Sequence, residues 1–283
     1  MAFSDIEIST QGGKPTFLYE FHYGNSYWRY TTNDEDLEGV GLDENDDPAN
    51  WIALAITDEG VTQGGSDQND IQISIASNSP VPALFRTGQP TGKVWCKVRM
   101  YHLGDDPTET PMVWSGSITN SVYVDDATEQ LAGRSLAGTY DRTGLRLTWC
   151  RQCTHPLYGV GCNRAGSNDK EDHAYPRTIA TLTANSFTCT AHSEPDEGSF
   201  SGGFVEWVRD DGSFDRRAIE LQDGNDFQIM GSTAGLEIGT EVTIYPGCPR
   251  TTDACILFQG HVKNYGGVPH LPGKSPFDGS PVF

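Results

Sequence analysis

The stretch Cys150-Arg-Gln-Cys153-Thr-His-Pro-Leu-Tyr-Gly-Val-Gly-Cys162 gathers three of the seven cysteines of this chain. A second pair closes the segment Tyr245-Pro-Gly-Cys248-Pro-Arg-Thr-Thr-Asp-Ala-Cys255. Glycine and proline surround both pairs, and these residues bend the backbone so that thiolates can converge on one point. The spacing therefore predicts a site that is built from two thiol pairs and connects distant parts of the chain.

Four paired cysteines leave several interpretations open, namely free buried thiols, two disulfides, a zinc site or an iron–sulfur site. Eight residues separate Cys153 from Cys162, and six separate Cys248 from Cys255. Zinc ribbons usually have gaps of about two to four residues, so the longer gaps favour a larger body such as a cubane cluster. The first residues lack the basic and apolar regions of a secretory signal, so we expect synthesis in a reducing cytoplasm, which disfavours disulfides.

The composition is typical of a mainly β protein and gives the chain a strongly negative net charge. The 283 residues include 32 glycines and 16 prolines, as expected for many turns between short strands. Lys and Arg number 19 against 39 Asp and Glu, a formal net charge of −20. This charge argues against a nucleic-acid-binding surface and is compatible with a surface that repels DNA. The longest clearly apolar run, 51–56, is too short to span a bilayer, so no membrane segment is expected.

Alternating apolar residues predict strands in the first half of the chain. Phe17, Tyr19, Phe21 and Tyr23 share one face of a strand, and Gly24-Asn25 is typical of a hairpin turn. Further strands are expected at 27–32, 51–57, 71–75, 94–101 and 112–118. Cys96 lies on the apolar face of one of them and is interpreted as a core thiol. Residues 128–136 are expected to form a short helix.

A second block of strands follows the first cysteine pair. Its expected strands are 179–182, 186–191, 203–209, 217–221, 227–230 and 241–245, with Asp210-Asp211-Gly212 as a hairpin turn. We therefore predict two mainly β domains, 1–140 and 141–283, the second of which carries the four cysteines and an extended C-terminal tail. Residues 266–283 are expected to pack against the cysteine region or a neighbouring protein.

No motif predicts an active site. The seven histidines show none of the spacings of a metalloenzyme helix, and there is no nucleophile elbow, phosphate loop or dinucleotide fingerprint. His155 is interpreted as a loop residue, with a position beside the metal ligands or an alternative ligand role left open. The acidic run Asp43–Asp47 lacks the glutamate that would complete a calcium loop. The chain is therefore not expected to be an enzyme.

The segment from Cys153 to Cys162 resembles an element of the tail tip protein L family of lambdoid siphophages, in which two cysteine pairs hold a [4Fe–4S] cluster. Cys248 and Cys255 resemble the second pair, and Asn264-Tyr265-Gly266-Gly267-Val268-Pro269 is similar to the ending of that family. The long insert 163–247 resembles instead the related baseplate hub proteins of gene transfer agents and many siphophages. Shared features there are Gly202-Gly203-Phe204-Val205 and Gly247-Cys248, together with the N-terminal Phe17-Leu18-Tyr19-Glu20-Phe21 and Arg29-Tyr30-Thr31-Thr32.

This resemblance implies two β-barrel-like hub domains that are tied together by a four-cysteine iron–sulfur site. The implied ligands of a structural [4Fe–4S] cluster, with zinc as the alternative metal, are Cys153, Cys162, Cys248 and Cys255. Cys150 remains an alternative to Cys153 as the first ligand. The other functions left open are an iron–sulfur redox protein and a β binding module stabilised by zinc or disulfides.

The resemblance also implies a place in the virion. A structural hub of this kind joins the tail tube to the tail tip or baseplate, and a homotrimer of two-domain chains presents six tube-like units. Its implied neighbours are the distal tail protein and the tail tip or fibre-bearing protein. DNA would pass through the channel without specific binding, and assembly would take place in the host cytoplasm.

Overall fold

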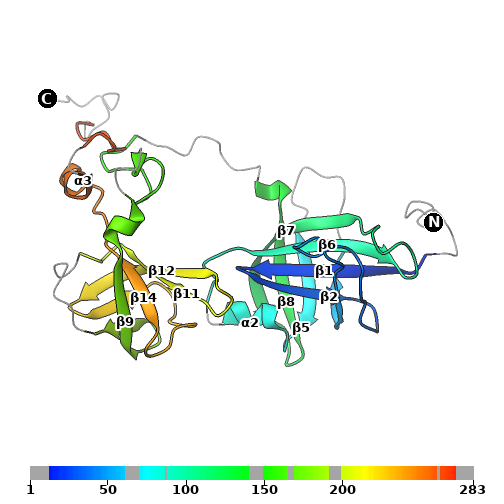
Figure 1. The fold of residues 1–283 in the computed structure, drawn as a ribbon. Coiled ribbons are helices and arrows are strands. Elements are labelled where there is room, and N and C mark those ends of the chain that lie inside the picture. Colours follow the sequence, from blue (N-terminus) through cyan, green and yellow to red (C-terminus); the bar gives the residue numbers. More distant parts are fainter. Residues whose placement is uncertain are drawn as a thin grey trace. The chain divides into compact units, whose positions relative to one another are not determined.

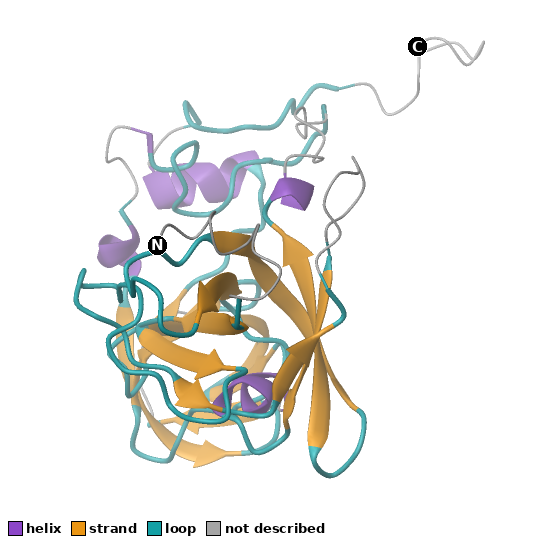
Figure 2. Cartoon of the chain, turned by 90° about the vertical axis from the view of Figure 1, so that its right-hand side faces the viewer, coloured by secondary structure: helices purple, strands orange, loops and turns teal. Residues whose placement is uncertain are grey.

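The computed structural model describes residues 13–60, 70–86, 88–139, 149–164, 169–190, 199–259 and 262–271. The chain divides into two compact units. The first comprises residues 1–142 and 210–213, and the second comprises 143–209 and 214–283. The expected domain boundary at residues 140 and 141 lies outside the described residues. The mainly β class is confirmed, since the described part contains many strands and little helix (Figure 2).

The first unit is an eight-stranded sheet with the order β3-β2-β1-β6-β7-β8-β5-β4 (Figure 1). Its strands are β1 (Pro15–Tyr23), β2 (Ser26–Thr31), β3 (Ile52–Ala53), β4 (Ile56–Asp58), β5 (Ile71–Ala76), β6 (Val94–His102), β7 (Met112–Tyr123) and β8 (Thr128–Ser135). Strands β2 and β3 pair in parallel, and the other neighbours are antiparallel. The short helix α2 (Pro80–Arg86) follows β5. The first domain was expected to be barrel-like. In the described part of the chain its sheet is an open half-barrel.

Two local predictions for this unit are wrong. The strand expected at 51–57 is two short strands, because β3 pairs with β2 and β4 pairs with β5 at opposite ends of the sheet order. The helix expected at 128–136 is strand β8. Its buried positions alternate with a period of two, and β5 and β7 supply its backbone partners on either side. Cross-strand pairing outweighs the local helical preference at this position.

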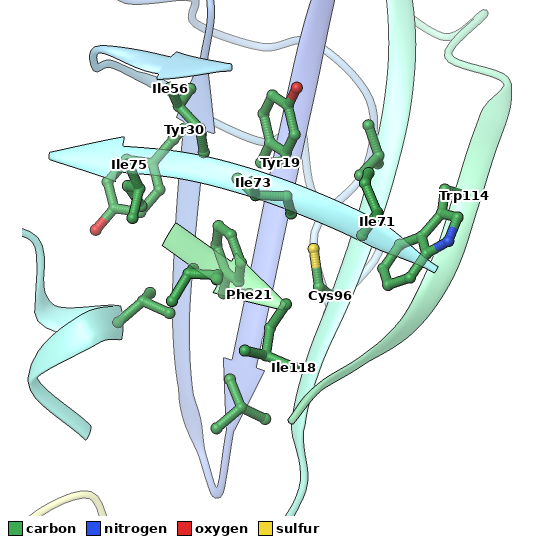
Figure 3. Close-up of a cluster of buried hydrophobic side chains, with 14 of the residues drawn as sticks. Tyr19, Phe21, Tyr30, Ile56, Ile71, Ile73, Ile75, Cys96, Trp114 and Ile118 are labelled. Atoms are coloured by element: carbon green, nitrogen blue, oxygen red, sulfur yellow. The ribbon is translucent and has the colours of Figure 1, made fainter. Parts of the chain in front are cut away.

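The core of the first unit lies against strand β1, which is buried on both faces. Tyr19, Phe21 and Tyr23 belong to one cluster, whereas Leu18 packs with Trp51 in another. The expected aromatic face of this strand is therefore confirmed. Cys96 is fully buried in the first cluster, as predicted, and Figure 3 shows its thiol among the aliphatic and aromatic side chains of that core.

The second unit contains a closed six-stranded barrel with the order β10-β13-β12-β11-β14-β9. Its strands are β9 (Tyr175–Leu182), β10 (Ser186–Cys189), β11 (Phe204–Val208), β12 (Phe214–Asp223), β13 (Asp226–Ile229) and β14 (Glu241–Tyr245). Val208 pairs with Phe214 across the hairpin that Asp210-Asp211-Gly212 predicted. Inward side chains such as Val205, Ile219 and Ile244 form the core. Helix α3 (Thr252–Gln259) lies outside the barrel (Figure 1).

We expect Gly116→Ala to destabilise the first unit by about 1–3 kcal/mol, because overpacking forces neighbours to shift. A Cβ at this position would lie 2.2 Å from the Arg134 carbonyl oxygen and 2.6 Å from the ring of Trp114. The measurement is urea unfolding of the whole chain. The matched control is Gly138→Ala, where the nearest atom, 3.2 Å away, belongs to the flexible side chain of Arg134. Equal stability of the two variants would contradict the packing of Trp114 described here.

Candidate functional site

The four predicted ligands line one cavity of about 60 Å³ in the second unit, although they come from three separate segments. Cys153 and Cys162 lie in the loop before β9, Cys248 follows β14, and Cys255 is on helix α3. The four cysteines therefore join segments within one unit. The expectation that they tie the two domains together is wrong. Among the described residues, no three His, Cys, Asp or Glu side chains form a group that could hold a metal ion.

Two glycines let the chain leave the barrel at the position of Cys248. A Cβ on Gly203 would lie 2.0 Å from the Tyr245 carbonyl oxygen, and a Cβ on Gly247 would lie 2.1 Å from that of Ser201. Only glycine permits backbones to approach this closely. The start of β11 and the end of β14 thus touch directly, which gives a physical reason for both glycine motifs noted in the sequence.

Helix α3 presents Cys255, and the sequence analysis did not predict this helix. Thr251 acts as its N-cap, since its hydroxyl oxygen accepts a hydrogen bond from the Ala254 amide at 3.2 Å. Asp253 in the first turn adds a favourable charge at the helix N-terminus. The run Thr-Thr-Asp was the available signal. Before the helix, the Arg250 carbonyl accepts a hydrogen bond from the Cys153 amide at 3.1 Å, which joins the two cysteine segments.

Tyr158 anchors the loop between Cys153 and Cys162 to the barrel. Its φ of 58° lies in the left-handed region, which is uncommon for a bulky residue. The ring stacks on His173 with centroids 5.6 Å apart and meets the rings of Phe204 and Tyr245 edge-on at 6.2 Å. Burial raises the pKa of the phenol, and the nearby charges of Cys162 and Cys248 raise it further. The loop is therefore held by aromatic packing at its centre.

A buried carboxylate supports this aromatic group. Glu206 accepts hydrogen bonds from Lys170 and Arg216, both at 2.7 Å. Burial by itself would raise the pKa of Glu206, but the two cations outweigh it and lower the pKa. The same cations lie over aromatic rings, Lys170 over Tyr245 and Arg216 over Phe204. Charge pairing and cation–π contacts thus hold the rings against which Tyr158 packs.

The thiols of the site influence one another electrostatically. Burial raises the pKa of Cys255, and the negative charges of Cys153, Cys162 and Cys248 raise it further. Burial also raises the pKa of Cys248, with a further increase from Cys162 and Cys153. Two sulfurs accept backbone hydrogen bonds, Cys153 from Gly266 at 3.3 Å and Cys248 from Arg250 at 3.4 Å. The four thiols therefore lie close together in a partly buried environment.

Residues 264–271, which we call the strap, cross the cysteine-bearing loop. Their hydrogen bonds to residues 150–162 include Val268 N to Cys150 O, Tyr265 Oη to Arg151 O, Arg151 Nε to Leu271 O, Thr154 Oγ1 to Gly266 O and Asn264 Nδ2 to Cys162 O. This agrees with the expectation that the tail packs on the cysteine region, as far as Leu271. Residues 272–283 lie outside the described residues. The glycine- and proline-rich composition predicted an extended segment here, but it did not predict which residues the strap contacts.

His155, Asn264 and Tyr265 also line the cavity. The sequence analysis left His155 open and gave Asn264 no role, because their contacts depend on a segment about a hundred residues away. Cys150 does not line the cavity, and its thiol donates to the Gln152 carbonyl at 3.0 Å. Of the two candidates for the first ligand, Cys153 is the one that lines the cavity.

Comparisons with known proteins concern both the fold and this site. The whole chain superposes on a chain of a solved structure described as the virion of the native gene transfer agent particle. The TM-score is 0.74 with 16% sequence identity, over 99% of each chain. The two chains therefore share a fold. Residues 198–275 match the family described as "Phage conserved hypothetical protein BR0599", and this range includes Cys248, Cys255 and the whole strap. A comparison with curated proteins gives no match.

We expect Tyr158→Ala to lower the free energy of unfolding by about 2–3 kcal/mol, since it removes a partly buried aromatic ring from a packed group. The matched control is Val160→Ala in the same loop. Val160 is 93% exposed, so its truncation should change stability by less than about 0.5 kcal/mol. Thermal unfolding of both variants tests this prediction, and similar losses in the two would contradict the anchoring role of Tyr158.

Proposed function

We propose that this chain is a structural, non-enzymatic virion protein, the hub component that joins a phage-type tail tube to the tail tip or baseplate. The carrying observation is the fold shared over 99% of both chains with a protein of the gene transfer agent virion. The phage family match at residues 198–275 supports the same assignment independently of the fold. No helix in the described residues is long and apolar enough to cross a membrane.

The proposed hub carries a structural [4Fe–4S] cluster on Cys153, Cys162, Cys248 and Cys255. The donor set supports this part of the proposal, because among the described residues four thiols and no carboxylate line the cavity. Soft thiolates are the usual ligands of iron–sulfur clusters and also of structural zinc, which is the alternative metal. When bound, the cluster would supply four sulfur–iron bonds that cross-link the loop, the β14 exit and α3. Such bonds stabilise segments that have little apolar surface to bury.

The assembly that we propose is a homotrimer, whose two β units per chain would present six tube-like units to a sixfold tail. Its neighbours would be the distal tail protein and the tip or fibre-bearing protein. The formal net charge of −20 supports passage of DNA through a channel without specific binding, because an acidic wall does not capture phosphates. Assembly would take place in the host cytoplasm.

Replacing any one of Cys153, Cys162, Cys248 or Cys255 with Ser should remove most of the bound iron and sulfide, together with the absorption at about 400 nm. The measurement is metal and sulfide analysis of anaerobically purified protein. Cys150→Ser and Cys189→Ser are the controls and should keep both, since neither thiol lines the cavity. If the wild-type protein contains zinc and no sulfide, the bound metal is zinc and the proposal of a cluster is wrong. Bleaching by Cys150→Ser but not by Cys153→Ser would reverse the ligand assignment.

Assembled particles should contain three copies of this chain in a ring at the tail tip, with acidic side chains toward the channel. Cryo-electron microscopy of the tail tip measures both copy number and position. A hexamer, a peripheral fibre position or a channel lined by Lys and Arg would contradict the proposed hub. In free solution a monomer is compatible with the prediction, because neighbouring tail proteins would close the ring.

A further inference from the structure

His155 lies two residues after Cys153 and lines the same cavity as the four thiols. Its Nδ1 atom is 3.0 Å from the carbonyl oxygen of Asn264 in the strap. A carbonyl oxygen only accepts hydrogen bonds, so Nδ1 must carry the proton and donate it. The partner therefore fixes both the orientation of the ring and its tautomer, as is usual for histidines at metal sites.

Two glycines enclose the imidazole. A Cβ on Gly161, in the cysteine loop, would lie 2.6 Å from the ring, and a Cβ on Gly266, in the strap, would lie 2.8 Å from it. Neither glycine has a positive φ, so close contact with the ring, and not backbone conformation, is what requires a residue without a side chain at these positions. The ring thus fills the space between the loop and the strap.

The strap in turn contacts both cysteines of the first pair. The Gly266 amide donates to Cys153 Sγ at 3.3 Å, and Asn264 Nδ2 donates to the Cys162 carbonyl at 3.0 Å. Asn264 is 8% exposed, so its bonds are largely shielded from water. Hydrogen bonds to ligand sulfurs are one of the factors that set the reduction potential of an iron–sulfur group, because they favour its more negative state.

We propose that His155 is a positioning residue, which fixes the strap so that the Gly266 amide stays on Cys153 Sγ and thereby sets the reduction potential of the bound group. This inference rests on the proposed four-cysteine cluster. It assigns to His155 the role of holding the hydrogen-bond donor and not that of a ligand. Four thiols already satisfy a [4Fe–4S] cluster, which takes one cysteine for each of its four irons.

Two substitutions separate these roles, because each keeps one nitrogen of the imidazole. The amide nitrogen of His155→Asn replaces Nδ1 and can still donate to the Asn264 carbonyl. The amide nitrogen of His155→Gln replaces Nε2 instead, and the Asn264 carbonyl then loses its hydrogen-bond donor. If His155 positions the strap, the asparagine variant should resemble the wild-type protein and the glutamine variant should not. If Nε2 is a ligand, the asparagine variant should be the more damaged of the two.

The experiment is a redox titration of the anaerobically purified whole chain, followed by electron paramagnetic resonance, with iron and sulfide measured in every sample. His155→Gln should shift the potential to a more negative value, and His155→Asn should leave it near that of the wild type. The second measurement is the rate at which a ferrous chelator removes iron. This rate should rise about tenfold or more for His155→Gln only, the scale on which residues that orient metal ligands affect metal binding.

The results distinguish failure of the positioning role from failure of the proposed cluster. Equal potentials and equal iron loss in His155→Gln and wild type would overturn the positioning role alone, as would loss of the cluster from His155→Asn. A strongly coupled imidazole nitrogen in the resonance spectrum would also overturn it, since it shows direct ligation. Wild-type protein without iron and sulfide would overturn the proposed cluster, and the positioning role with it.

Discussion

Four thiols share one small cavity, and they would repel each other as thiolates. Burial and the charges of the neighbouring thiols raise the pKa values of Cys248 and Cys255. Such a group is stable only if the surrounding chain holds it in place, and a cationic partner would turn the repulsion into attraction. The contacts between the cysteine loop, the β14 exit, helix α3 and the strap all serve this convergence, so the outer part of the second unit depends on it.

This dependence explains why the outer layer differs from the barrel beneath it. Inside the barrel, residues such as Val205 and Ile244 are fully buried and need no other support. Outside it, Val160 and Trp149 are 93% and 81% exposed, and hydrogen bonds to backbone carbonyls add to the aromatic packing of Tyr158. Metal–thiolate bonds of the proposed cluster would compensate for the missing core, as they do in other small domains that bind metal. A rigid cross-link of this kind would suit the structural role that we propose.

Local patterns predicted individual strands well and their partners poorly. The alternation of Tyr19, Phe21 and Tyr23 marked β1 because every second residue of a strand faces the core. The alternation in β8 was missed, since its buried set includes Glu129, Gly133 and Ser135, which are not apolar in the sense that the pattern requires. Strands β3 and β4 were merged because nothing in the seven residues 52–58 indicates that the chain crosses from one end of the sheet order to the other.

The sequence by itself determined the β class, the acidic charge, the core position of Cys96 and the two thiol pairs. These follow from composition and from short-range periodicity, which act at the level of single residues and neighbours. Tertiary structure alone decided that one sheet stays open while the other closes, that Cys153 and not Cys150 reaches the cavity, and that the strap meets His155. The physical reason is sequence separation, because contacts between residues about a hundred positions apart depend on how whole elements pack and leave no trace in the local pattern.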